Sequence, residues 1–97
     1  MAIQVIALVT VNDDEPQALA AYIAATFPLM EKAGGKILRR FTVNEVVVGH
    51  KPAKSVMIIE YPSREAVDLV FESEIYRNII PIRDIAFLDY HVSIVSD

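Results

Sequence analysis

The chain has 97 residues, a formal net charge of −4 and no cysteine. This length suits one small folding unit, so we expect a single domain over residues 1–97. The lack of thiols excludes disulfides, thiol catalysis and cysteine-based metal sites. The negative net charge argues against nucleic acid as a partner, because phosphate binding needs a basic face. Hydrophobic residues make up 54% of the chain, more than a monomer of this size easily buries, which indicates a partner surface.

The N-terminal segment contains an apolar run, Val5–Val9, with no basic stretch before it. The run is too short for a signal peptide or a membrane span, so we expect a cytoplasmic protein that does not bind membranes. Residues 3–11 predict a strand with apolar side chains on both alternating faces, which is typical of a strand buried on both sides. One face carries Ile3, Val5, Ala7, Val9 and Val11, and the other carries Ile6 and Leu8 with Gln4 and Thr10.

Residues 12–14 predict a turn and a helix N-cap, and apolar spacing predicts a helix over residues 15–33 with a kink at Pro28. Gly34-Gly35 supplies the left-handed position that ends it. A second strand is expected over residues 36–48, broken near residues 43–45. On this strand we expect Leu38, Arg40 and Thr42 to share one face, and Ile37, Arg39 and Phe41 to share the other.

The second half of the chain continues with a turn over residues 49–54 and a third strand over residues 55–61, again apolar on both faces. Ser63 is expected to cap one helix. Ser73 is expected to cap a shorter helix over residues 74–80 that ends or bends at Pro81. The last strand covers residues 87–95, with Tyr90, Val92 and Ile94 on one face and Asp89, His91 and Ser93 on the other.

This β-α-β-β-α-β order predicts an α+β, ferredoxin-like sandwich with an antiparallel sheet. Right-handed crossovers place the first and third strands in the middle and the helices on one face. The opposite face would leave Ile6, Leu8 and one row of the third strand in water. A second copy of the sheet is the simplest cover, so we expect a homodimer.

Five short strings occur in an order that resembles the bacterial domain-of-unknown-function family 1330, in the dimeric α/β-barrel superfamily. They are Thr10–Asp13, Glu31–Lys36, Ile59–Ala66, Ser73–Tyr76 and Pro81–Arg83. The resemblance covers nearly the whole chain. It implies that two sheets pack face to face into a barrel with a small cavity in each half. It also implies a basic residue near the end of the second strand, matched by Arg40, and an arginine matched by Arg83.

Arg40 and Glu60 are candidate ligand-binding residues. Arg40 is predicted to point into the barrel, where a guanidinium binds carboxylates and oxyanions well. The alternative is an intersubunit ion pair with Glu60 or Asp89. Glu60 ends a central strand, where a carboxylate is costly unless it is paired.

His91 and Arg83 complete the candidate set. His91, beside Asp89, has the chemistry of a general base, and the alternative is the ordinary polar face of an edge strand. Arg83 lines the mouth of the cavity or pairs with Asp84. His50 and His91 have no metal-ligand spacing, so we expect no metal site. Tyr22 and Tyr76 have apolar neighbours and are interpreted as core residues.

The sequence leaves open whether the protein is an enzyme. The first hypothesis is a cofactor-free dimer that binds a small organic molecule, with anions among the candidates, in the barrel cavity. The superfamily resemblance adds cofactor-free monooxygenases and isomerases. A second class is a non-catalytic homodimer that acts as a structural or regulatory protein. A binding protein needs a cavity on which Arg40, Glu60 and His91 converge, whereas a structural dimer fills that volume with side chains.

Overall fold

The computed structural model describes residues 1–96, and within them four strands and three helices form two layers. The elements in chain order are β1 (Ile3–Val11), α1 (Pro16–Lys32), β2 (Lys36–Thr42), β3 (Ser55–Tyr61), α2 (Arg64–Phe71), α3 (Glu74–Ala86) and β4 (Phe87–Val95). All neighbouring strands are antiparallel, and their order is β2-β3-β1-β4. The prediction of an α+β ferredoxin-like fold with β1 and β3 in the centre is confirmed.

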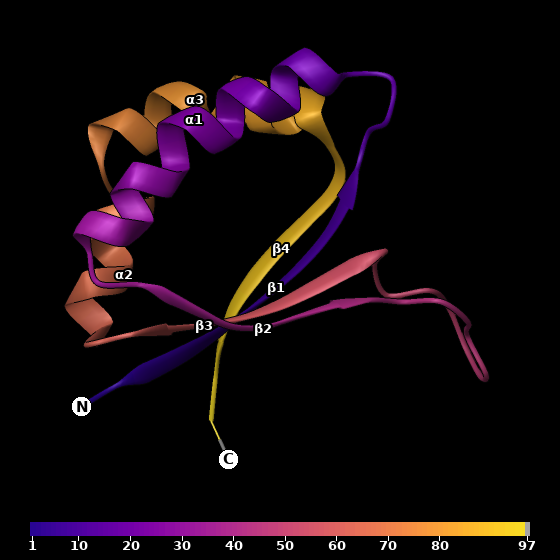
Figure 1. Cartoon of the computed structure of the whole chain (residues 1–97), viewed down its shortest axis with the longest axis horizontal. Coiled ribbons are helices and arrows are strands. Elements are labelled where there is room, and N and C mark those ends of the chain that lie inside the picture. The colour runs from indigo at the N-terminus through magenta and orange to yellow at the C-terminus, as the bar shows by residue number, and fades with distance from the viewer. Residues whose placement is uncertain (97) are drawn as a thin grey trace.

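The three helices lie on one side of the sheet, and the other side carries no helix within residues 1–96 (Figure 1). The covered side is called the helix face and the other side the open face. Val5, Ala7 and Val9 of β1 are buried on the helix face, as the alternation predicts. On the open face Ile6 and Leu8 lie opposite Ile58 and Val56, and all four remain partly exposed.

Short-range polar contacts explain where several helices begin and end. Ser63 Oγ accepts a hydrogen bond from the amide of Ala66 at 3.1 Å, and Ser73 Oγ accepts one from Tyr76 at 3.0 Å. Both N-cap predictions are therefore confirmed. Gly34, with φ of 83°, ends α1 in the left-handed region that glycine adopts without strain.

Two predictions about helix ends are wrong. Residues 12–14 form a turn, in which Asn12 Oδ1 accepts from the Asp14 amide, but no side chain caps α1. The helix begins instead at Pro16, whose fixed φ suits a first helical position. Pro81 lies inside α3, which continues to the fully buried Ala86. Packing of the last turns of α3 against the rest of the core offsets the hydrogen bond that Pro81 removes.

The second strand is shorter than expected, and its bulge lies near its start. It ends at Thr42, and residues 43–54 form a loop that extends away from the helices (Figure 1). The register with β3 shifts between Ile37 and Arg39. After this bulge Arg40 lies opposite Met57 on the helix face, while Arg39 lies opposite Ile58 on the open face. The expected grouping of Ile37 with Arg39 is therefore wrong, because one extra residue interrupts the alternation.

The core lies between the helices and the helix face. Val5 and Ala86 have no exposed surface, and Tyr61 has 1%. Within residues 1–96, no helix is long and apolar enough to cross a membrane.

The core gives a direct stability test. We expect Val5→Ala to lower the free energy of unfolding by about 2–3 kcal/mol, because it removes buried methyl groups and leaves a cavity. Val47→Ala is the control, since Val47 is 89% exposed in the β2–β3 loop, and it should change stability by less than about 0.5 kcal/mol. Urea denaturation monitored by circular dichroism measures both. Equal effects would contradict the assigned core.

Candidate functional site

A cavity of about 490 Å³ lies between α1 and the helix face of the sheet. Its floor includes Val9, Met57 and Ile59, and its roof includes Thr26 and Phe27 of α1. The helix α1 packs mainly against α3, and residues of β1, β2 and β3 line the cavity beneath α1. Its walls are largely apolar, and its outer side is open to solvent where Phe27 is 43% exposed.

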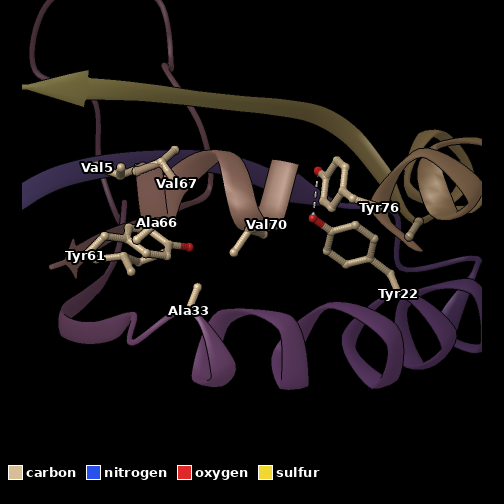
Figure 2. Close-up of a cluster of buried hydrophobic side chains, with 10 residues drawn as sticks. Val5, Tyr22, Ala33, Tyr61, Ala66, Val67, Val70 and Tyr76 are labelled. Atoms are coloured by element: carbon tan, nitrogen blue, oxygen red, sulfur yellow. Dashed lines mark hydrogen bonds between the residues drawn. The ribbon is translucent and has the colours of Figure 1, made fainter. Parts of the chain in front are cut away.

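Three tyrosines from three different elements meet at the inner end of this cavity. Tyr22 of α1 has its hydroxyl 3.1 Å from that of Tyr76 of α3 and 2.5 Å from that of Tyr90 of β4. Figure 2 shows the Tyr22 and Tyr76 hydroxyls facing each other across the helix layer. The rings pack edge to face, with centroids 6.2 Å apart for Tyr22–Tyr76 and 5.7 Å for Tyr22–Tyr90. We call these three residues the tyrosine cluster.

Arg83 of α3 adds a positive charge to the tyrosine cluster. Its Nη1 donates to the Tyr76 hydroxyl at 3.4 Å, and its guanidinium carbon lies 5.3 Å from the centre of the Tyr90 ring. On its other side the guanidinium pairs with Asp84 at 3.2 Å. The Arg83 side chain is 24% exposed and that of Asp84 is 64% exposed, so water weakens this ion pair from the carboxylate side.

Burial raises the pKa of two phenols of the cluster, Tyr22 and Tyr90. It raises the pKa of Tyr22, and the neighbouring Tyr90 and Tyr76 hydroxyls raise it further. Burial also raises the pKa of Tyr90, although the nearby charge of Arg83 acts in the opposite direction. For Arg83 itself burial lowers the pKa, but hydrogen bonding to Tyr76 and the charge of Asp84 outweigh it and raise the value. At neutral pH Tyr22 and Tyr90 are therefore neutral phenols beside a cation.

Arg40 lies at the opposite edge of the same cavity. It is exposed and lines the cavity from β2. Within residues 1–96, the structure shows no ion pair between Arg40 and a carboxylate. Its neighbour Arg39 points to the other face, where its guanidinium carbon lies 4.5 Å from the centre of the Phe41 ring.

The structure divides the four candidate residues between two faces of the sheet. Arg40 and Arg83 are on the helix side, at the cavity and the tyrosine cluster. Glu60 faces Gln4 and Lys36 on the open face, and His91 faces Leu8 on the same face. The expected convergence of Arg40, Glu60 and His91 on one cavity is therefore wrong. A ligand-binding role for Glu60 and His91 stays a prediction, and it would require a second site.

The sequence predicts part of the tyrosine cluster, because it indicates that Tyr22 and Tyr76 are core residues. Tyr22 and Tyr76 are buried, as expected of core residues, but their hydroxyls also take part in a polar network. Tyr90 was assigned to the apolar face of β4 without a role. The usable signal is that three tyrosines occupy apolar positions on separate elements, because a buried phenol requires a hydrogen-bonding partner.

Metal ligands of the usual kinds do not gather in the described part of the chain. No group of three or more His, Cys, Asp or Glu side chains within residues 1–96 could hold a metal ion. The cavity lining contains tyrosine, serine, threonine and arginine side chains, which form hydrogen bonds and bind anions.

Comparison with known proteins supports the fold. A family model described as domain of unknown function 1330 (DUF1330) matches residues 4–97. A protein of unknown function from Rhodopseudomonas palustris is similar over 99% of this chain and 82% of its own, with 24% identity and a TM-score of 0.82. No curated protein matches the sequence.

Two further solved structures share the fold at lower similarity. A dimeric protein of unknown function with a ferredoxin-like fold, from Bacteroides fragilis, covers 99% of this chain and 96% of its own, with 11% identity and a TM-score of 0.59. A protein described as an antibiotic biosynthesis monooxygenase covers 100% of this chain and 98% of its own, with 19% identity and a TM-score of 0.61. These likenesses show the fold alone.

The raised pKa of Tyr22 predicts how stability depends on pH. The unfolded chain releases the Tyr22 proton above about pH 10, whereas the folded chain keeps it, so the free energy of unfolding falls as pH rises beyond that point. In Tyr22→Phe this loss should be shallower by up to about 1.4 kcal/mol per pH unit. Urea denaturation at a series of pH values compares the two proteins. Parallel curves above about pH 10 would show that Tyr22 ionises normally.

Proposed function

The chain belongs to the DUF1330 family, and we propose that it is a homodimer that binds a small, mainly apolar organic molecule between α1 and the sheet. One observation supports this most strongly. The cavity of about 490 Å³ has apolar walls and a few polar groups at its ends, which is the usual composition of a small-molecule site. We therefore propose a ligand site within each chain, rather than one between the two sheets of the dimer.

The open face supports the homodimer. Its centre is a row of apolar side chains on the two middle strands, Ile6, Leu8, Val56 and Ile58. Glu60 and His91 lie beside this centre, at positions suited to polar contacts at the edge of an interface. The similar Bacteroides fragilis protein is described as dimeric. A cytoplasmic location remains a prediction from the sequence.

Binding in the cavity is testable with 2-naphthol, a neutral aromatic probe. Thr26→Trp should weaken its binding at least about tenfold, because Thr26 lines the cavity and an indole would occupy that space. Ala21→Trp is the matched control, since Ala21 is exposed on α1 and does not line the cavity. Isothermal titration calorimetry measures both. Undetectable binding to the unchanged protein, or equal weakening in both variants, would contradict the proposal and favour a structural homodimer.

The dimer is tested by placing a charge on the open face. Leu8→Lys should convert the protein into a monomer, because an ammonium group would be buried without a partner between two sheets. Leu69→Lys is the control on α2, where Leu69 is 65% exposed on the helix side. Sedimentation equilibrium gives the mass of each. A monomeric unchanged protein, or a dimer that persists in Leu8→Lys with circular dichroism unaltered, would contradict pairing through this face.

A cofactor-free monooxygenase is the second candidate, supported by the similar structure described as an antibiotic biosynthesis monooxygenase. Within residues 1–96, the cavity lining contains no histidine or carboxylate, and burial raises the pKa values of Tyr22 and Tyr90. These phenols are poor proton acceptors at neutral pH, which disfavours isomerisation by proton abstraction. A monooxygenase would therefore act only on a substrate that ionises readily and then reacts with oxygen itself.

A further inference from the structure

We propose that the ligand is an aromatic carboxylic acid with an acceptor oxygen at its far end. Arg40 pairs with its carboxylate, and the tyrosine cluster hydrogen-bonds the distal oxygen. This inference rests on the proposed function, because it assigns a ligand class to the same cavity. Three features carry it: the span between the two polar ends, the hydrogen-bond donors of the tyrosine cluster, and the position of Arg40.

The sheet places the two polar ends of the cavity, Arg40 and Tyr90, far apart on its helix face. Arg40 belongs to edge strand β2 and Tyr90 to edge strand β4, with β3 and β1 between them. Across the sheet Arg40 is level with Val92, two residues from Tyr90. Three inter-strand spacings and this offset put the Cα atoms of Arg40 and Tyr90 about 16 Å apart. Both side chains line the cavity, and Val9 and Met57 form apolar floor between them. Because side chains stand roughly perpendicular to a sheet, a ligand that contacts both ends must be elongated, which suits a flat ring system rather than a single small anion.

The hydroxyls of the tyrosine cluster can donate to a ligand. The Tyr22 hydroxyl contacts those of both other tyrosines, and all three residues line the cavity. Because Arg83 donates to the Tyr76 hydroxyl, that oxygen already has a donor, and a phenolic O–H of the cluster can turn to an external acceptor. The guanidinium lies over the Tyr90 ring and adds positive potential at this end. This end therefore suits a carbonyl or phenolic oxygen.

Arg40 supplies the second recognition element. Arg40 lines the cavity and is exposed, so a carboxylate that forms a bidentate pair with its guanidinium can stay partly hydrated. The bulge between Ile37 and Arg39 directs Arg40, rather than Arg39, to this face. Adjacent arginines of similar exposure thus face opposite sides of the sheet, which provides a control one residue away.

The test uses four probes on the unchanged protein: 6-hydroxy-2-naphthoate, 2-naphthoate, 2-naphthol and 4-hydroxybenzoate. Calorimetry should rank 6-hydroxy-2-naphthoate first, with each naphthalene that lacks one polar group about tenfold weaker. The shorter 4-hydroxybenzoate should also be weaker, since it reaches only one end. If 2-naphthol fails to bind, the proposed function fails. If 2-naphthol binds and the carboxylate adds no affinity, only the present inference is overturned.

Two matched pairs of variants locate the contacts. Arg40→Gln should weaken both naphthoates about tenfold and leave 2-naphthol unchanged, whereas Arg39→Gln should alter none of them. Tyr90→Phe should remove the advantage of 6-hydroxy-2-naphthoate over 2-naphthoate, whereas Tyr61→Phe should retain it, because no side-chain hydrogen bond joins Tyr61 to the cluster. Equal losses within either pair would overturn that assignment. If a variant does not fold, the four probes on the unchanged protein still test the proposed ligand class.

Discussion

Both faces of β1 and β3 are apolar, and the rest of the structure depends on covering them. Val5, Ala7 and Ile59 are buried under the helices, while Ile6, Leu8 and Ile58 point the other way and stay partly exposed in the single chain. A central strand with two apolar faces requires a layer on each side. The chain supplies one layer from its three helices, and a second copy is our proposal for the other.

The helix layer is smaller than the sheet that it covers, and this mismatch produces the cavity. The helix α1 packs mainly against α3, and the cavity lies between α1 and residues of β1, β2 and β3. Phenols from α1, α3 and β4 meet beside the cavity. The Tyr22 ring also packs edge to face against the rings of Tyr76 and Phe87. The cavity thus has the tyrosine cluster toward the β4 edge of the sheet and Arg40 at the β2 edge.

Much of the fold was predictable because its signals are local. Alternation located β1, β3 and β4 with their observed bounds, and the handedness of crossovers gave the strand order. The candidate site was less predictable because it depends on a bulge and on distant contacts. One register shift in β2 turned Arg40 to the helix face. The hydroxyl contacts join residues 54 and 68 positions apart, which no sequence period reveals.

The most direct test of the account is a crystal structure of the protein with 6-hydroxy-2-naphthoate bound. We predict two chains packed through their open faces, with one probe per chain between α1 and the sheet. Its carboxylate should contact Arg40, and its hydroxyl should contact the tyrosine cluster. A probe bound instead between the two sheets, beside Glu60 and His91, would contradict the assignment of the site to the helix face.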